Sequence, residues 1–157
     1  LLWNCVNASH AQELSADDHV LTVLPLFHVG GLCIQTLPAL HAGATVTLHR
    51  RFEPGAWLAD VQARRASLSV MVPATLRAVM AHPEWAGCDL TSLRMLVAGS
   101  SVVPRALLEA FHARGVPVGQ VYGATETGPV SIYLRREDAM RVPGSRADRI
   151  ERKEPPP

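Results

Sequence analysis

The stretch "VYGATETGP", residues 121–129, places an aromatic ring, two glycines, hydroxyl groups and a carboxylate within nine residues. The ring of Tyr122 could stack on a planar ligand while its hydroxyl reaches water. Gly123 would let a ligand approach the backbone closely. Thr125 offers a hydroxyl to a phosphate oxygen, and Glu126 offers the hard oxygen ligand that Mg²⁺ prefers. These groups could hold a nucleotide with its metal, or they could form a polar strand-to-loop turn without a ligand.

Two other short segments could contribute to a site. His28 in "LPLFHVGGL" precedes two glycines; a histidine there could gate a pocket or contact a carboxylate, or it could simply be packed. The segment "AGSS", residues 98–101, could cradle an anion, flank a ring or form a tight turn. A hydrolase pair of Ser100 or Ser101 with a histidine is disfavoured, because "AGSSV" is not G-x-S-x-G and no carboxylate is placed to orient His28. Neither zinc-ligand spacing nor a GxxxxGK[ST] phosphate loop is present.

Strand and helix patterns alternate around these segments. Short apolar or alternating runs predict strands at 19–25, 44–50, 67–72, 92–99 and 116–123. Amphipathic runs bounded by Pro or Gly predict helices at 30–43, 53–65, 73–82 and 104–115. This regular alternation predicts an α/β fold with a parallel sheet, right-handed crossovers and flanking helices.

Both polar segments directly follow predicted strands, which gives them a common location. In open parallel sheets, ligands bind beyond the carboxyl ends of the strands. The segment 98–101 follows one strand and 122–126 follows the next strand along the chain. We therefore expect the two loops to line one crevice.

Composition limits the classes of protein to consider. The 157 residues are 48% hydrophobic with a net charge of +1, which suits one domain with a core and gives no reason to expect a nucleic-acid or membrane partner. No apolar run is long enough to span a bilayer. Cys5, Cys33 and Cys88 are scattered, which argues against a disulfide framework and for a reducing, cytoplasmic location. The start "LLWNCVNASH" lacks an initiator Met and signal-peptide features, so we expect an internal fragment.

Five segments, in one order and at compatible spacing, resemble a known family. They are "LPLFHVGGL", "HAGATVTLHRRFEP", "VPATLRAVMAHP", "DLTSLRMLVAGSSVVPRALLEAF" and "GVPVGQVYGATETGP". Together they are similar to the central part of the AMP-forming adenylating enzymes, which include acyl-CoA synthetases, aryl-CoA ligases, luciferases and peptide-synthetase adenylation domains. The similarity extends from about His19 to about Ser145, and "YGATE" is its most specific segment.

The resemblance implies a fold and a reaction. Residues 1–145 would be a partial AMP-binding domain, within the large N-terminal domain of such a synthetase, and 146–157 a disordered or aberrant tail. With ATP and Mg²⁺, a carboxylic acid would become an acyl-adenylate and then, with coenzyme A, a thioester. The family's Ser/Thr/Gly-rich phosphate loop ending in Lys, its ribose-binding Asp and its lid domain have no counterpart among these residues. The alternative is therefore an inactive remnant, or a nucleotide- or acyl-binding module.

The resemblance also implies roles for single residues. Thr125, Glu126 and His28 match catalytic positions, and Glu126 matches the carboxylate that helps to hold the metal. The residues that match the nucleotide site are Gly99, Ser100, Ser101, Gln120, Val121, Tyr122, Gly123, Ala124 and Thr125. The residues that match the acyl site are His28, Gly30, Ser101 and Gly123.

Three features stay open at this point. Ser100 stands where the family usually has Gly, and Val102 where it usually has Pro, so the shape of that loop is undetermined. The small residues Gly30, Gly31 and Ser101 would accommodate a bulky or aromatic acid, and a medium-chain fatty acid fits as well. The acceptor could be coenzyme A or the thiol of a carrier protein, and no feature of the sequence indicates an oligomeric state.

Overall fold

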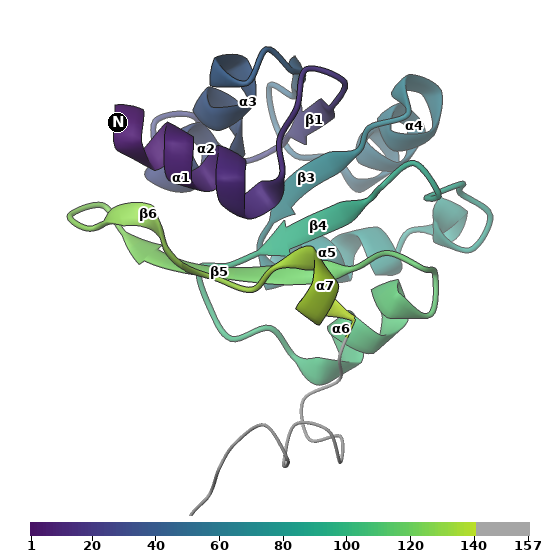
Figure 1. Ribbon diagram of the computed structural model, residues 1–157. Helices are drawn as coiled ribbons and strands as arrows, with labels where there is room; N and C mark the ends of the chain where they lie inside the picture. The colour runs from purple at the N-terminus through teal and green to yellow at the C-terminus, as the bar shows by residue number, and fades with distance from the viewer. Residues whose placement is uncertain (141–157) are drawn as a thin grey trace, which may run out of the picture.

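The structure is a computed structural model, which describes residues 1–140 (Figure 1). The predicted tail at 146–157 and the last residues of the predicted domain at 1–145 lie outside the described residues. Those two boundaries therefore stay predictions.

One six-stranded sheet runs through the molecule in the order β2-β1-β3-β4-β5-β6. Its strands are β1 (His19–Thr22), β2 (Thr45–Leu48), β3 (Leu68–Met71), β4 (Met95–Ala98), β5 (Val118–Ala124) and β6 (Gly128–Tyr133). The first five are mutually parallel, and β6 pairs antiparallel with β5. The predicted parallel α/β fold is confirmed, and each of the five predicted strands is present. The sixth strand was not predicted, because Gly128 and Pro129 at its start are typical of a loop.

Helices cover both faces of the sheet. They are α1 (Leu2–Gln12), α2 (Val29–Gly31), the π-helix η1 (Leu32–Thr36), α3 (Leu37–His41), α4 (Pro54–Arg64), α5 (Pro73–Met80), the 3₁₀-helix η2 (Pro83–Trp85), α6 (Arg105–His112) and α7 (Arg136–Ala139). The predicted single helix at 30–43 is wrong in detail, since that segment is divided into α2, η1 and α3. Helices α1 and α7 were not predicted.

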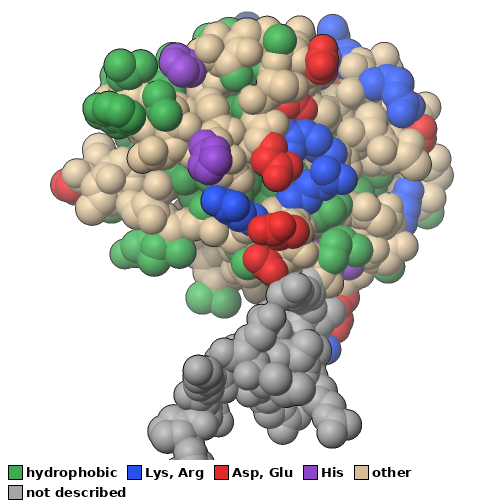
Figure 2. All heavy atoms as spheres, viewed as in Figure 1, with side chains coloured by type: hydrophobic (Ala, Val, Ile, Leu, Met, Phe, Trp, Pro, Cys, Tyr) green, Lys and Arg blue, Asp and Glu red, His purple; other side chains and the backbone are tan. Residues whose placement is uncertain are grey.

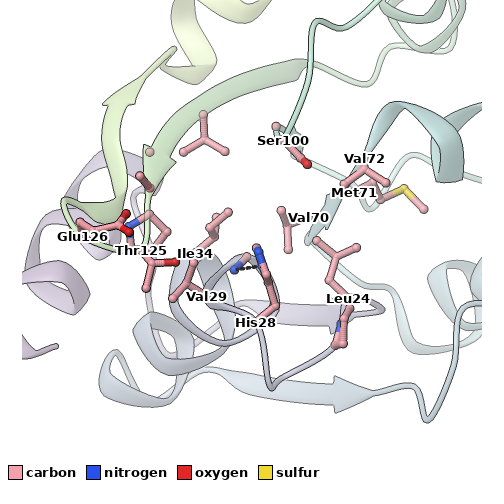
Figure 3. A pocket seen from close by; sticks show the side chains of 17 residues that line it. Leu24, His28, Val29, Ile34, Val70, Met71, Val72, Ser100, Thr125 and Glu126 are labelled. Carbon is pink, nitrogen blue, oxygen red and sulfur yellow. Dashed lines mark hydrogen bonds between the residues drawn. The ribbon is translucent and has the colours of Figure 1, made fainter.

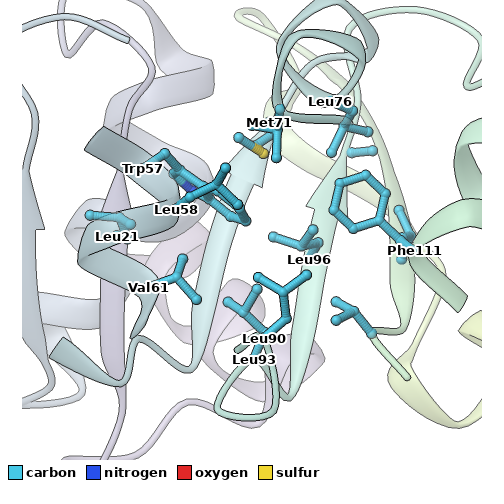
Figure 4. Packing of buried hydrophobic residues seen from close by; sticks show 14 of the residues in the cluster. Leu21, Trp57, Leu58, Val61, Met71, Leu76, Leu90, Leu93, Leu96 and Phe111 are labelled. Carbon is cyan, nitrogen blue, oxygen red and sulfur yellow. The ribbon is translucent and has the colours of Figure 1, made fainter. Parts of the chain in front are cut away.

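The apolar core lies on both faces of the strands because successive side chains alternate. Leu21 and Leu96 point to the face that α4, α5 and α6 cover, where they pack with Trp57 and Phe111 (Figure 4). Their immediate neighbours along the strands, such as Val97, belong to clusters on the opposite face. That face is covered by α1, α3 and η1 (Figure 1).

The strand order reverses direction at β1. The chain passes from β1 to β2 on one side and then returns to place β3 on the other side. In doubly wound sheets a crevice opens beyond the carboxyl ends of the strands at such a switch point. The topology therefore places a binding crevice beyond the ends of β1 and β3.

Helix α1 holds η1 in place through buried side chains. A π-helix is a rare, locally irregular form that often occurs at functional sites. The Asn4 side-chain amide donates to the Cys33 carbonyl at 2.7 Å, and the Gln12 amide donates to the Ile34 carbonyl at 2.8 Å. Gln35 in turn donates to the Gln12 side-chain oxygen at 3.0 Å. These contacts satisfy buried carbonyls in the irregular segment, so α1 determines where η1 lies.

An ion pair joins α1 to the amino ends of the strands. Arg94 contacts both carboxylate oxygens of Asp18, at 2.8 and 2.9 Å, and also donates to the Gln12 and Glu13 carbonyls at the end of α1. The Ser67 hydroxyl donates to the same carboxylate at 2.7 Å. Burial acts to raise the pKa of Asp18, but the hydrogen bonds from Arg94, Ser67 and Ser15 outweigh it and hold the pKa below its ordinary value.

The surface carries both signs of charge. On the face shown in Figure 2, acidic and basic side chains lie interspersed over the right half of the molecule and form no extended basic patch. Among the described residues, no helix combines the length and the apolar character that crossing a bilayer requires. The three cysteines are buried free thiols.

Replacing Arg94 should destabilise the protein much more than replacing an exposed arginine. Arg94→Leu leaves the Asp18 carboxylate buried without its partner, which should lower the free energy of unfolding by about 3 kcal/mol. Arg105→Leu removes the exposed ion pair with Glu109. This should change the free energy of unfolding by at most about 0.5 kcal/mol. Urea denaturation of both variants measures the difference, and equal effects would contradict this role for Arg94.

Stability should also fall in acid because of Asp18. The pKa of Asp18 is lower in the folded chain than in the unfolded chain, where it has its ordinary value of 3.8. The ionised Asp18 carboxylate therefore stabilises the folded state at pH values above 3.8. This stabilisation is lost as the pH falls through the lower pKa that Asp18 has in the folded state. Denaturation curves from neutral pH downward should show less acid destabilisation in Asp18→Asn than in the wild type. The exposed neighbour variant Asp17→Asn should keep the wild-type slope.

Candidate functional site

A cavity of about 470 Å³ lies beyond the carboxyl ends of β1, β3, β4 and β5 (Figure 3). This is the place that the switch in strand order predicts. Its lining residues are Leu24, Pro25, His28, Val29, Gly30, Ile34, Val70, Met71, Val72, Gly99, Ser100, Val121, Gly123, Ala124, Thr125, Glu126 and Pro129. The crevice expected between 98–101 and 122–126 is therefore present in the fold.

The floor of the cavity is apolar. Ile34 from η1, Val70 from β3 and Val121 from β5 form one buried cluster, against which Leu24 packs. These side chains come from four separate segments that the parallel sheet brings to one edge. A floor of this kind binds hydrocarbon surface and offers no hydrogen bonds to a polar group.

His28 lies at the rim of the cavity with its ring held in one orientation. The Gly30 backbone N–H donates to His28 Nδ1 at 2.9 Å, as the dashed line in Figure 3 shows. Because Nδ1 accepts this bond, the neutral ring carries its proton on Nε2. His28 can therefore donate from Nε2 to a ligand that enters the cavity.

Thr125 and Glu126 lie together at one side of the cavity, across from Leu24 and Met71 (Figure 3). They occupy the tight connection between β5 and β6, in which Ala124 pairs with Gly128. Gly128 has a φ of +82°, a left-handed conformation that glycine adopts without strain and that suits a three-residue hairpin loop. No hydrogen bond or ion pair within the described residues engages the Thr125 hydroxyl or the Glu126 carboxylate, so both are available to a ligand.

Thr127 fixes the conformation of this hairpin loop. Its Oγ1 accepts a hydrogen bond from the Ala124 backbone N–H at 3.2 Å and shares another with Ser131 Oγ at 2.9 Å. Thr127 was not among the predicted site residues. The signal that could have found it is a hydroxyl residue in a short polar turn, since such side chains often hydrogen-bond nearby backbone groups.

The glycines of the site lack room for a side chain, each because of a different neighbour. A Cβ on Gly123 would lie 2.4 Å from the Pro129 carbonyl oxygen, and one on Gly99 would lie 2.8 Å from Val121. Both positions therefore require glycine for packing. A Cβ on Gly31 would lie 2.3 Å from the Pro25 carbonyl oxygen. Gly31 packs against that loop and does not line the cavity, which corrects its expected role as a small pocket residue.

A second hollow adjoins the first and shares Ser100, Val121 and Gly123 with it. It is lined in addition by Ser101, Val102, Gln120, Tyr122, Ile132, Tyr133 and Leu134. Tyr122 is 68% exposed there, and its cross-strand partner Ile132 is similarly exposed. A large, exposed aromatic face beside a hollow suits a stacked planar ring.

The structure shows the shape of the loop after β4. The sequence left this shape open, because Ser100 and Val102 depart from the family pattern. Ser100 has a φ of +74°, in the left-handed region that costs a side-chain-bearing residue about 1–2 kcal/mol. The position therefore favours glycine, and Ser100 occupies it with strain. Val102 in the same loop is 90% exposed.

Apart from Gly31, the predicted site residues thus lie in the two adjoining hollows. His28, Gly30, Gly99, Ala124, Thr125 and Glu126 line the first, Ser101, Gln120 and Tyr122 line the second, and Ser100, Val121 and Gly123 line both. Ser101 therefore lies beside Tyr122 and not in the cavity that contains His28. Within residues 1–140, no group of three or more His, Cys, Asp or Glu side chains could hold a metal.

The fold and the site define a class of protein: an α/β protein with a ligand cavity at a strand switch point and a hydroxyl–carboxylate pair at its rim. The chain belongs to the family of AMP-binding enzymes, whose sequence model matches residues 1–149. This confirms the resemblance found in its sequence motifs.

Two relatives show how much of the family's length the chain covers. It is 52% identical over 145 residues to an indoleacetate–CoA ligase of Aromatoleum aromaticum and 41% identical to a feruloyl-CoA synthase of an Amycolatopsis species. Each alignment covers 92% of this chain, but only 28% and 30% of the two relatives. The chain therefore spans less than a third of these proteins.

Solved structures support the same family. The N-terminal domain of FACL13 from Mycobacterium tuberculosis matches 88% of this chain, and 35% of its own, with a TM-score of 0.81 and 27% identity. The o-succinylbenzoate–CoA synthetase of Bacillus subtilis, in complex with ATP and magnesium ion, matches 88% of this chain and 28% of its own, with a TM-score of 0.74 and 29% identity. The sheet and its helices thus correspond to part of the N-terminal domain of acyl-CoA synthetases.

Removing the Thr127 hydroxyl should loosen the hairpin loop. Thr127→Val keeps the shape of the side chain but removes the acceptor for the Ala124 N–H, which should lower stability by about 1 kcal/mol. Amide hydrogen exchange at Ala124 should become faster in this variant. Thr127→Ser keeps the hydroxyl and should exchange like the wild type. Unchanged exchange in Thr127→Val would show that the hydroxyl does not hold the loop.

Proposed function

We propose that this chain forms the acyl and nucleotide site of an enzyme that activates a carboxylic acid with ATP and transfers it to coenzyme A. The observation that carries the proposal is one cavity in which His28, Thr125 and Glu126 surround an apolar floor, in a member of the AMP-binding enzyme family. An acid needs an apolar surface for its hydrocarbon part and polar groups at its carboxylate. The cavity supplies both within one space.

His28 would orient the carboxylate of the acid. With the ring held by the Gly30 N–H, its Nε2–H can donate to one carboxylate oxygen while the hydrocarbon part rests on Val70 and Ile34. The other oxygen then remains free to attack the α-phosphate of ATP, which would form the acyl-adenylate as the bond to the β-phosphate breaks and pyrophosphate leaves. Holding the reactants in this geometry lowers the entropic part of the barrier.

Thr125 and Glu126 would act on the phosphate side. The Thr125 hydroxyl can donate to a phosphate oxygen, and the Glu126 carboxylate can bind Mg²⁺. A single protein carboxylate fits this metal, because Mg²⁺ commonly binds one or two carboxylates together with substrate phosphates and water. When bound, the metal neutralises phosphate charge as the phosphorus–oxygen bond breaks.

The second hollow would hold the adenine ring. Tyr122 offers an exposed aromatic face, and Ser101 and Gln120 offer polar side chains at its edge. Ser100, Val121 and Gly123 line both hollows, and Gly99 and Ala124 line the first cavity. An AMP moiety that spans both would bring its phosphate to Thr125.

Coenzyme A is the proposed acceptor because the relatives are CoA ligases or synthases by name. The names of these relatives include both aromatic acids and long-chain fatty acids, so they do not define one class of acid. A CoA-dependent reaction and three free cysteines favour a cytoplasmic location.

A second candidate function is binding without turnover. It applies to the 157-residue chain taken by itself, which spans 28% of the indoleacetate–CoA ligase. A chain of this length on its own would bind nucleotide or acid in the two hollows without completing the reaction. Acyl-adenylate formation by the purified 157-residue chain would exclude this candidate.

Glu126 offers the direct test of the proposed function. In the protein as its gene encodes it, Glu126→Gln keeps the size of the side chain but removes its charge. Carboxylate-dependent exchange between ATP and pyrophosphate should fall by about 100-fold or more. Glu109→Gln, on the exposed surface of α6, should keep wild-type exchange. Wild-type exchange in Glu126→Gln would refute the role of this carboxylate.

A further inference from the structure

We propose that Asn4 of α1 is a positioning residue, which sets where the loop between β5 and β6 lies relative to the helical segment that follows His28. That loop carries Thr125 and Glu126. The inference rests on the proposed function and adds a residue that lines neither hollow. Its support is a pair of contacts that the Asn4 side chain makes, one with η1 and one with the end of the loop.

One half of the Asn4 amide is bound to η1. Its Nδ2 donates to the Cys33 carbonyl at 2.7 Å. This bond fixes the orientation of the amide, because a carbonyl only accepts hydrogen bonds and the donor must face it. The Asn4 Oδ1 is therefore turned away from Cys33, toward a second neighbour.

The other half of the amide faces the loop between β5 and β6. A Cβ on Gly128 would lie 3.5 Å from the Asn4 Oδ1. Among the described residues, no other atom beyond the chain neighbours of Gly128 comes within 4 Å of that position. The loop therefore meets α1 at the residue that ends it, two residues after Glu126. Figure 1 shows α1 alongside the hairpin of β5 and β6.

The segment that Asn4 holds is joined directly to His28. The His28 carbonyl accepts hydrogen bonds from the backbone N–H groups of Gly31 and Leu32, at 3.1 and 3.0 Å. Leu32 is the first residue of η1, so a shift of η1 would also move the backbone of His28. Asn4 thus links the histidine side of the cavity to the side with the hairpin loop.

Apolar packing between the same two elements does not set their offset. Val130 of β6 packs against the cluster that contains Ile34 of η1. Burial of apolar surface is non-directional, so this contact tolerates sliding of the hairpin along η1. The Asn4 amide has a defined position, because its hydrogen bond to Cys33 is directional. A displacement of about 1 Å at reacting groups can lower a rate by about 100-fold.

Asn4→Ala tests this role in the protein as its gene encodes it. Alanine favours a helix, so the variant should fold, but it lacks both halves of the amide. The assay is exchange of ATP with pyrophosphate, with whichever acid the wild type uses best among acetate, hexanoate, dodecanoate, phenylacetate and 2-naphthylacetate. The kcat should fall by about 10-fold, while the KM for that acid stays within about 2-fold of the wild-type value.

The matched control is Asn7→Ala, which removes the same side chain from an exposed position of α1 and should keep the wild-type kcat. If circular dichroism shows that Asn4→Ala is unfolded, Asn4→Ser should give the same pattern with smaller factors. A wild-type kcat in a folded Asn4 variant would overturn the proposal.

A double-mutant cycle shows whether Asn4 acts through the loop. If Asn4 positions Glu126, Asn4→Ala should cost about 10-fold in kcat in the wild type but less than about 2-fold in Glu126→Gln, where the charge to be positioned is already absent. An Asn4 that only stabilises the fold would cost the same factor in both backgrounds. That result would refute the positioning role.

Amide hydrogen exchange separates this proposal from the proposed function. The backbone amides of 124–128 should exchange about 5-fold faster in Asn4→Ala than in the wild type and in Asn7→Ala. Faster exchange there, in a wild type that shows no exchange of ATP with pyrophosphate with any of the five acids, would refute the proposed function but support the contact with the loop. Catalytic exchange by the wild type, with unchanged amide exchange and kcat in Asn4→Ala, would support the function and refute the role of Asn4.

Discussion

The site exists because β1 lies between β2 and β3 in the sheet. The connection from β1 to β2 crosses one face, through α2, η1 and α3, and the connection from β2 to β3 crosses the other, through α4. The two connections diverge, so neither covers the carboxyl ends of β1 and β3. Leu24 and Val70 therefore become the floor of a cavity instead of part of a closed core.

The walls of this cavity depend on residues that are distant in the sequence. Gln12 and Asn4 of α1 hold the carbonyls of η1, and thereby the position of Ile34 at the floor. Arg94 binds the end of α1 and the Asp18 carboxylate at the opposite end of the sheet. The geometry of the site is thus stabilised by an ion pair that lies outside it.

Much of the fold could be predicted from sequence because buried parallel strands produce short apolar runs between helices. The segment 30–43 was predicted as one helix and is instead divided around η1. Its irregular turn is stabilised by Gln12 and Asn4, and no local pattern in 30–43 records those partners. Helix α1 escaped prediction for a related reason, since Trp3 is exposed and the helix has no strong apolar stripe.

The sequence by itself determined which chemical groups the chain carries and in what order, and hence the family and the polar residues of the site. Tertiary structure alone decided which of two adjacent glycines, Gly30 and Gly31, lines the cavity. A Cβ on Gly30 would meet the His28 ring, with Nδ1 at 3.0 Å, whereas a Cβ on Gly31 would lie 2.3 Å from the Pro25 carbonyl oxygen. Likewise, the strain at Ser100 arises from its backbone conformation, with φ of +74°. Space and strain depend on neighbours that only folding brings together.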